Sequence, residues 1–251
     1  MQDDETSRRT ERLANRRQVY VRRRGRMTRG QERALTDLRD TYCIDTKQTT
    51  LADCFADLSA DQTEPSPESV PEIGIEIGFG MGHATAHWAL LRPDMRLLGI
   101  EVYEPGIGSL MASLKGQDIC NVRIIEGDAR VILEEWVPKG ALSQINLFFP
   151  DPWPKKRHAS RRIVQHDTVA LYASRLAPGG TLRIATDWQP YAEWILECVD
   201  ANPDLINMAR GPGGERSEGY AERAPERPVT NFEARGLRLG HGVWDFWYER
   251  S

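Results

Sequence analysis

The chain has 251 residues, of which 40% are hydrophobic and 28% are charged, a composition typical of a soluble globular protein. No apolar run approaches the roughly 18 to 20 residues that a membrane span needs, and the polar, Arg-rich residues 1–30 lack the apolar segment of a secretory signal. The four cysteines are scattered, and no two have the spacing of a zinc ligand pair. We therefore expect a cytoplasmic protein with no membrane association and no metal site.

The net charge of −4 hides two strongly basic segments. Residues 1–30 carry ten arginines against four acidic residues, and residues 151–162 carry five Lys and Arg against one Asp. Local patches of charge determine phosphate affinity far more than the total charge does. Either segment alone is equally consistent with a solvated tail or loop, so the charge indicates a nucleic-acid partner only together with other features.

The texture of the sequence changes along the chain and predicts three parts. Residues 1–59 form a basic N-terminal extension, in which Gly30–Leu38 has the length of a short helix. Residues 60–71 hold three prolines without helical periodicity and are predicted to form a linker. Residues 72–251 are predicted to form the main domain.

Short β-rich segments alternate with helical segments in the main domain. The predicted strands are Gly74–Phe79, Leu97–Val102, Val122–Gly127, Ile145–Phe149, Thr181–Thr186 and Val243–Glu249. The predicted helices are His83–Leu91, Pro105–Lys115, Ala129–Val137 and Ile163–Leu176, the last one ended by Pro178-Gly179-Gly180. This alternation predicts an α/β fold with a mostly parallel sheet that is covered by helices on both faces.

A glycine-rich loop, Glu76-Ile-Gly-Phe-Gly-Met-Gly82, follows the first predicted strand and opens a helix. Its glycines let the backbone turn tightly and approach a ligand without collisions of Cβ atoms. The spacing lacks the third glycine of a dinucleotide loop and the Gly-Lys-Ser/Thr of a phosphate loop. Glu76 would repel a pyrophosphate but suits a ligand that carries an amino group and a sulfonium.

Two further carboxylates follow the next two predicted strands. Glu101 closes the second strand, where a carboxylate can accept hydrogen bonds from both ribose hydroxyls, and Asp128 closes the third, within reach of an adenine edge. Each acid alone could be an ordinary exposed residue at a strand end. Together they lie at the edge where open α/β sheets bind ligands, and they favour S-adenosylmethionine over NAD.

The segment Phe148-Phe-Pro-Asp-Pro-Trp-Pro154 follows the fourth predicted strand. Its prolines restrict the backbone, so that Asp151 is held at the edge of the ligand crevice, and Trp153 offers an apolar face that can stack on a base. Five basic residues placed to hold phosphates come next: Lys155, Lys156, Arg157, Arg161 and Arg162. The alternative is a rigid proline-rich turn whose Trp packs into the core.

These stretches resemble the bacterial tRNA (guanine-N7-)-methyltransferases over about residues 20–250, with gaps at 45–70 and 205–225. The matching runs are Arg24–Arg33, Glu76–Gly82, Gly99–Val102, Phe148–Trp153, Arg157-His158, Arg161–Gln165, Ala185–Trp188, Arg227–Glu233, Arg235-Gly236 and Arg238–Asp245. The resemblance implies a Rossmann-like class I methyltransferase with a mostly parallel seven-stranded sheet. It also implies S-adenosylmethionine as cofactor, tRNA as partner, and methylation of a guanine N7, commonly at position 46 in the variable loop.

The resemblance further implies roles for individual residues. Asp151 is the implied catalytic residue, and the cofactor site is implied for Glu76, Gly78, Gly80, Gly82, Glu101, Asp128 and Asp151. The substrate guanosine is implied to contact Lys155, Asp187, Thr230, Asn231, Phe232 and Glu233. The RNA is implied to contact Arg157, His158, Ala159, Ser160, Arg161 and Arg162. The family usually has Lys at the position of Asn231, so one charged contact to the RNA is expected to be missing or replaced.

Guanine N7 carries a free lone pair, so we expect Asp151 to orient the base and stabilise positive charge more than to act as a general base. Glu233 and Asp187 could instead be structural partners of the C-terminal arginines. Two alternative functions stay open: a methyltransferase acting on another substrate, and a non-catalytic RNA-binding module of the same fold. The acids at three strand ends and the Asp151 turn argue against lost catalysis. The sequence leaves the oligomeric state open.

Overall fold

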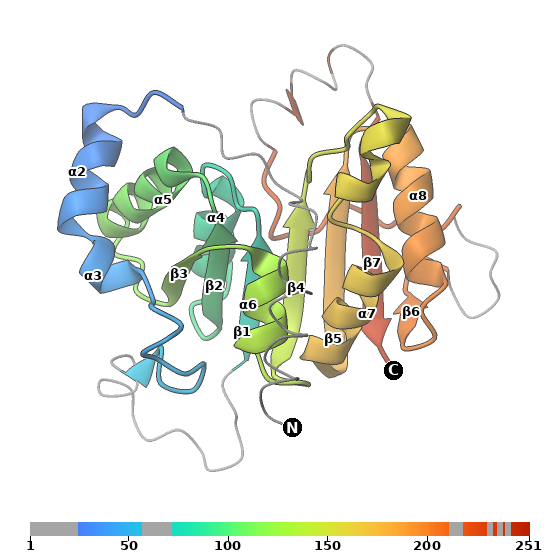
Figure 1. The fold of residues 1–251 in the computed structure, drawn as a ribbon, viewed down its shortest axis with the longest axis horizontal. Helices are drawn as coiled ribbons and strands as arrows, with labels where there is room; N and C mark the ends of the chain where they lie inside the picture. The colour runs from blue at the N-terminus through green and yellow to red at the C-terminus, as the bar shows by residue number, and fades with distance from the viewer. Residues whose placement is uncertain (1–24, 57–71, 211–217, 230–232, 235–237, 239–241) are drawn as a thin grey trace, which may run out of the picture.

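The computed structural model describes residues 25–56, 72–210, 218–229, 233–234, 238 and 242–251. Its centre is a seven-stranded sheet in the order β3-β2-β1-β4-β5-β7-β6 (Figure 1). The strands are β1 (Ile73–Ile77), β2 (Arg96–Glu101), β3 (Val122–Glu126), β4 (Leu142–Phe148), β5 (Leu176–Thr186), β6 (Leu205–Asn207) and β7 (Trp244–Arg250). Each predicted strand is present, and β6 was not predicted.

Strands β1 to β5 pair in parallel, whereas β7 runs antiparallel to both β5 and β6. The strand order reverses between β1 and β4, which lie side by side although two strands separate them in the chain. Loops that leave the carboxyl ends of these two strands diverge, and ligands of doubly wound folds bind in the crevice between them. The prediction of an α/β fold with a mostly parallel, seven-stranded, Rossmann-like sheet is confirmed.

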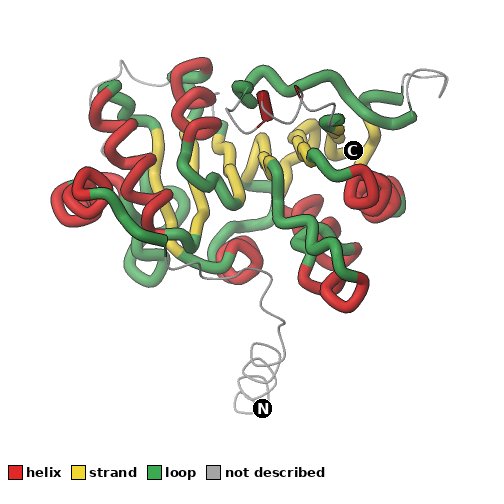
Figure 2. The backbone as a smooth tube through the Cα atoms, turned by 90° about the horizontal axis from the view of Figure 1, so that it is seen from above, coloured by secondary structure: helices red, strands yellow, loops and turns green. Residues whose placement is uncertain are grey.

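Helices cover both faces of the sheet, as Figure 2 shows from above. Along β2, Leu97 packs with Trp88, Ile107 and Leu110 on one face, whereas Leu98 and Ile100 pack with residues of α6 and α7 on the other. This alternation follows from the period of two in a strand. The helices are α2 (Arg29–Asp37), α3 (Arg39–Tyr42), α4 (His83–Leu91), α5 (Glu104–Gly116), α6 (Ala129–Glu135), α7 (His166–Arg175) and α8 (Gln189–Asp200). We call the face that carries α4 and α5 face A, and the face that carries α6, α7 and α8 face B.

Helix α7 ends at Arg175, three residues before the Pro178-Gly179-Gly180 stop that the sequence predicts. The chain enters β5 at Leu176, and the Pro-Gly-Gly run lies inside that strand. There the pairing with β4 shifts, from Leu142 opposite Leu176 to Gln144 opposite Thr181. Gly179 has φ of +76°, which suits glycine at an irregularity of a sheet. The run is therefore a break in strand register, and the prediction that it ends the helix is wrong.

Helix α8 was not predicted, although its sequence carries the signals of a helix. Pro190 occupies the first turn, where its missing N–H costs nothing. Tyr191, Ile195 and Cys198 recur at helical spacing and are buried on face B. The helix connects β5 to the short strand β6 and covers β5.

The described part of the N-terminal extension packs on the main domain. Thr28 and Gln31 form a capping box that starts α2 near the predicted position, with bonds of 3.3 and 2.9 Å. Helix α2 packs closely on α5. A Cβ atom at Gly108 would lie only 2.6 Å from the Gln31 carbonyl oxygen, so the close approach depends on glycine at this position. Phe55 is fully buried in the core of face B. The predicted linker 60–71 lies outside the described residues.

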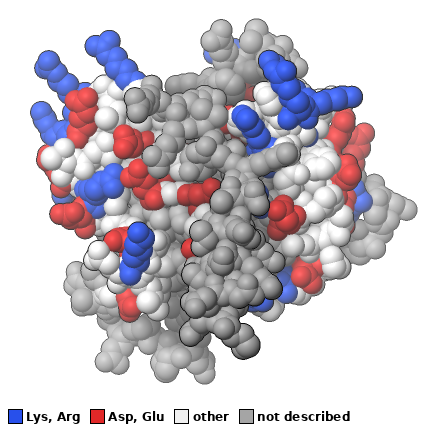
Figure 3. All heavy atoms as spheres, in the orientation of Figure 1, with Lys and Arg blue, Asp and Glu red and all other residues white. Residues whose placement is uncertain are grey.

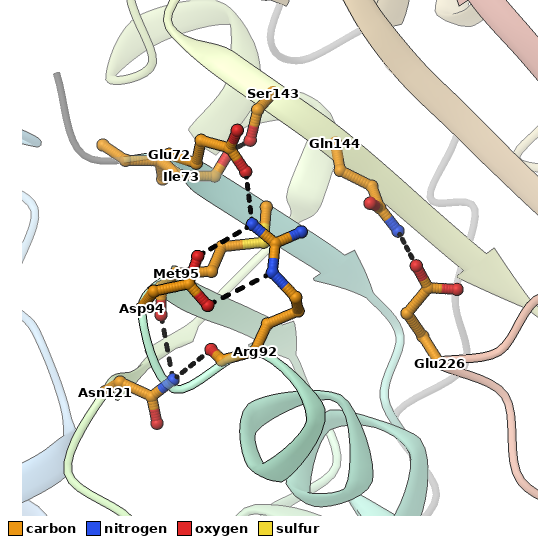
Figure 4. A network of polar contacts seen from close by, with 9 residues as sticks. All are labelled: Glu72, Ile73, Arg92, Asp94, Met95, Asn121, Ser143, Gln144 and Glu226. Atoms are coloured by element: carbon orange, nitrogen blue, oxygen red, sulfur yellow. Dashed lines mark hydrogen bonds and ion pairs between the residues drawn. The ribbon is translucent and has the colours of Figure 1, made fainter. Parts of the chain in front are cut away.

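Polar contacts tie the amino ends of the strands together (Figure 4). The Arg92 guanidinium, just after α4, donates to Glu72 at 2.6 Å and to Asp94 at 3.2 and 3.0 Å. Asn121 donates to the carbonyl oxygens of Arg92 and Met95 at 3.0 and 2.9 Å. These contacts fix the edge of the sheet opposite to the predicted ligand crevice.

Among the described helices, none is both long and apolar enough to cross a membrane.

Candidate functional site

Five carboxylates gather where the parallel strands end. In the order of the sheet from β3 to β5, the strand ends carry Asp128, Glu101, Glu76, Asp151 and Asp187. Glu76 is 3% exposed, Glu101, Asp128 and Asp187 are half-buried, and Asp151 is exposed. Such a concentration of negative charge favours a cationic ligand and disfavours a pyrophosphate.

The glycine-rich loop turns through three left-handed residues. Gly78, Gly80 and Gly82 have φ of +70°, +57° and +80°, a region that other residues rarely adopt. A Cβ atom at Gly82 would lie 2.6 Å from the Leu110 Cβ, whereas one at Gly78 or Gly80 would meet no atom within 4 Å. The first two glycines thus border open space at the carboxyl edge, and the third allows α4 to pack against α5.

Glu101 holds this loop in shape. Its Oε2 accepts a hydrogen bond from the Gly80 N–H at 2.8 Å, and its Oε1 accepts from the N–H groups of Val102 and Tyr103 at 2.7 and 3.1 Å. A carboxylate oxygen can accept more than one bond, so Glu101 retains capacity for a ribose hydroxyl. Glu101 therefore organises the loop in addition to its predicted contact with a ligand.

Glu76 is the most perturbed acid of this group. Burial raises the pKa of Glu76 to about 7, Thr85 lowers it by donating a 2.6 Å bond to Oε2, and the charge of Glu101 raises it further. Thr85 is the partner that the structure gives Glu76 among the described residues. A buried carboxylate at this edge fits a cationic group of a ligand, because an opposite charge would favour its ionised form.

Asp128 has a local structural role as well. Its carboxylate accepts the Arg130 N–H at 2.9 Å and caps the start of α6. This cap fixes the position of the Asp128 carboxylate at the start of α6. Asp187 follows β5 directly and lies beside the start of α8.

The turn that carries Asp151 is strained on both sides of that residue. Phe149 and Trp153 have φ of +53° and +45°, values that are uncommon for residues with a side chain. The Phe149 N–H donates to the Ala185 carbonyl of β5 at 2.8 Å, which fastens the turn to the neighbouring strand. Such strain persists where the surroundings determine the backbone, which is common at functional sites.

A 3-10 helix, η2 (Lys156–Arg161), follows the turn and carries most of the predicted RNA contacts. Lys155, Lys156, Arg157, Ser160 and Arg161 are exposed, and Figure 3 shows basic side chains gathered at this upper right part of the molecule. His158 and Ala159 are half-buried. The pKa of His158 is lowered by desolvation and by the positive charges of Arg161, Arg157 and Lys155.

Trp153 packs against this basic loop. The Arg161 guanidinium lies 5.1 Å from the centre of the Trp153 ring, and the His158 ring meets Trp153 edge-on at 5.7 Å. The indole is therefore half-buried beside η2 and outside the main apolar cores. A base that stacks on Trp153 would have to share the ring with Arg161.

Arg162 differs from the other residues of the predicted RNA-contacting run. It is 9% exposed, its Nε donates to the Pro152 carbonyl at 2.9 Å, and its guanidinium lies over the Tyr191 ring at 5.1 Å. Trp188 stacks on it from another side at 5.5 Å. This geometry favours a structural role, in which Arg162 connects the Asp151 turn to the start of α8, over a contact with RNA.

The C-terminal run of predicted guanosine contacts is only partly described. Thr230, Asn231 and Phe232 lie outside the described residues. The Glu233 carboxylate is fully buried, with Oε1 2.8 Å from Arg223 and Oε2 2.6 Å from Arg227. The structure thus gives Glu233 the arginine partners that the sequence leaves open as its alternative role. Residue spacing cannot find such a cluster, since Arg223, Arg227, Glu233 and Asp245 meet only through the fold.

Comparisons with known proteins bear on this site. Residues 71–246 match a family described as "Putative methyltransferase". A "tRNA (guanine-N(7)-)-methyltransferase" of Acidovorax sp. (strain JS42) is 48% identical over 231 residues, 92% of this chain and 85% of the relative. The chain belongs to the tRNA (guanine-N7-)-methyltransferase family. The relative of the same name from Albidiferax ferrireducens is 42% identical over 92% of this chain and 94% of its own length.

Among solved structures, the chain is similar to the 16S rRNA methyltransferase KamB, with a TM-score of 0.49 and 12% identity. The match covers 81% of this chain and 95% of KamB. A family of methyltransferases implies a methyl donor, and the acids at the carboxyl edge suit a donor that carries positive charge. In the described part of the chain, no three His, Cys, Asp or Glu side chains are grouped to hold a metal ion.

Proposed function

We propose that this chain transfers the methyl group of S-adenosylmethionine to N7 of a guanine in tRNA. One juxtaposition supports this best: Asp151 lies between the acids at the carboxyl ends of the strands and a loop of exposed cations. The acids suit the positive donor, and the cations suit the phosphates of RNA. The names of the relatives supply the atom and the RNA class.

On this proposal, Glu76, Glu101 and Asp128 hold the cofactor by its amino group, its ribose hydroxyls and its adenine edge. When bound, S-adenosylmethionine supplies an electrophilic methyl group on a sulfonium. Open space beside Gly78 and Gly80 gives the ligand room close to the backbone. The buried Glu76 carboxylate, which has a hydroxyl and no cation as its described partner, matches the ammonium group.

The chain's own groups then orient the base. Guanine N7 attacks with its in-plane lone pair, so the reaction needs alignment and stabilisation of the positive charge that develops on the purine. Asp151, together with Asp187, accepts hydrogen bonds from guanine N1–H and the N2 amino group. Both carboxylates favour the cationic product. Lys155 and the exposed side chains of η2 hold the flanking phosphates.

We further propose that the target lies in the variable loop, at position 46, and that the protein works in the cytoplasm.

The proposal is tested by incubating the protein with methyl-labelled S-adenosylmethionine and unmodified tRNA. We expect label in the RNA for the wild type and for Arg92→Lys, which alters only the opposite edge of the sheet, and a strongly reduced rate for Asp151→Asn. Label in a protein or a small molecule, with none in tRNA, would support a methyltransferase of another substrate. Salt-sensitive tRNA binding without transfer would support a non-catalytic module.

A further inference from the structure

Four charged residues form the most extensively buried ion-pair network of the described chain, and we call them the Arg227 cluster: Arg223, Arg227, Glu233 and Asp245. Arg227 is 2% exposed and donates through Nε and Nη2 to both oxygens of Asp245, at 2.9 and 2.6 Å. Its Nη1 donates to Glu233 at 2.6 Å, and Arg223 occupies the other oxygen of Glu233 at 2.8 Å. One guanidinium thus holds two buried carboxylates.

Stability alone does not explain this network. Burying Arg227, Glu233 and Asp245 carries a large desolvation penalty, and well-packed apolar residues often stabilise a fold as much or more. The two carboxylates raise the pKa of Arg227 against the opposing effect of burial, so its charge is kept. What a bidentate, fully bonded arginine adds is a fixed geometry between the segments that it joins.

Arg227 joins the turn that carries Asp151 to Glu233, which the family resemblance places among the guanosine contacts. Its guanidinium lies 5.1 Å from the centre of the Phe149 ring, two residues before Asp151. Phe149 donates its N–H to Ala185 of β5, and Ala185 is the residue opposite Asp245 on β7. The contacts therefore close a ring through Arg227, Asp245, Ala185 and Phe149.

The same set of contacts includes Glu233, which belongs to the C-terminal run of predicted guanosine contacts. Glu233 is the last residue of the run 230–233, and its carboxylate forms ion pairs with Arg227 and Arg223. The Asp151 turn and this run belong to distant parts of the sequence, and Arg227 contacts both. A shift of Arg227 would thus change the position of the Asp151 turn relative to Glu233.

We propose that Arg227 is a positioning residue for methyl transfer, which sets the Asp151 turn against the segment that carries Glu233. This inference rests on the proposed function. It assigns no contact between Arg227 and the substrate: Arg227 acts through Phe149, Asp245 and Glu233. Misplacement of reacting groups by about 1 Å costs on the order of 100-fold in rate, so a loss of this size is expected when the geometry relaxes.

The test compares Arg227→Lys with the wild type in single-turnover methylation of tRNA at saturating cofactor and enzyme. Lysine keeps the charge but cannot bond both carboxylates in a fork. We expect the rate constant to fall about 10- to 100-fold, while the Kd for S-adenosylmethionine changes less than about twofold. Assays run well below the Tm of the variant, measured in the same buffer, so that a merely destabilised but correctly folded protein would keep its rate constant.

Arg92→Lys is the matched control, since Arg92 also bonds two carboxylates but lies at the far edge of the sheet. Asp245→Asn provides a second variant should Arg227→Lys fail to fold, because it keeps the shape of the side chain and loses the charge pair. A wild-type rate constant in either folded variant would overturn the inference. A wild type that transfers no methyl group to tRNA would instead overturn the proposed function.

Discussion

The Glu76 carboxyl carries the clearest expectation at the scale of single residues. Its pKa of about 7 means that the carboxyl group is largely protonated below that pH. A cationic ligand favours the ionised form, so cofactor binding has to remove the proton at low pH. We expect the affinity for S-adenosylmethionine to rise as the pH increases from 5.5 to about 7 and to level off above it.

Isothermal titration in buffers of different ionisation enthalpy measures this effect. Proton release on binding should be detectable at pH 6 and vanish by pH 8.5. Glu76→Gln removes the titrating group and should bind more weakly at pH 8, with no release at either pH. Release of the same size in Glu76→Gln would assign the proton to another group.

Asp151 should behave differently from Glu76, because the expected role is charge and orientation and not proton transfer. Asp151→Asn keeps the shape and loses the charge, so the methyl-transfer rate should fall on the order of 100-fold or more. With saturating S-adenosylmethionine, which removes the influence of Glu76, the wild-type rate should be flat with pH between 6.5 and 8.5. A steep rise governed by a pKa near 7 under these conditions would favour general-base catalysis by Asp151.

At the scale of an element, substitutions in η2 should affect tRNA binding, whereas a substitution of Arg162, which follows η2, should affect stability. Arg157 and Arg161 are exposed, whereas Arg162 is buried against Pro152, Trp188 and Tyr191. Arg157→Gln and Arg161→Gln should each weaken tRNA binding and reduce the slope of log Kd against log salt by about 0.7 to 0.9 per lost phosphate contact. Arg162→Gln should lower the Tm and leave that slope unchanged. A reduced slope in a stable Arg162→Gln protein would return Arg162 to the RNA interface.

Elements also show what a sequence can and cannot reveal. The period of two in β2 and the Glu76–Gly82 loop are local patterns, so the strands and the glycine-rich turn were predictable. Pro178-Gly179-Gly180 misled because the same residues suit a helix end and a break in strand register, and pairing with β4 decides between them. Arg227 contacts Asp245 and Phe149 only through the fold of the sheet, so residue spacing in the sequence could not predict these contacts.

Over the whole molecule, an overall acidic charge coexists with two separate groups of basic side chains. Figure 3 shows Lys and Arg over α2 at the upper left and over the η2 region at the upper right, on either side of the sheet's carboxyl edge. Arg26, Arg29 and Arg33 are exposed at or near α2, and the carboxyl edge of the sheet, which carries the five acids, lies between the two groups. An RNA held by both groups would span the crevice.

Replacing Arg26, Arg29 and Arg33 by Gln tests that arrangement. We expect weaker tRNA binding and a smaller salt dependence, with an unchanged Kd for S-adenosylmethionine, since the cofactor acids are untouched. Filter binding of tRNA across a series of salt concentrations measures both quantities. An unchanged salt slope would show that α2 makes no contact with RNA phosphates.

The position of the transferred methyl group tests the central claim most directly. Methylation at N7 makes the purine cationic, so borohydride reduction followed by aniline breaks the RNA at the modified guanine and nowhere else. We predict a single break, in the variable loop at position 46, that depends on the wild-type protein and S-adenosylmethionine. A labelled tRNA that resists cleavage, with its methyl group on an exocyclic amine or another atom, would contradict the account.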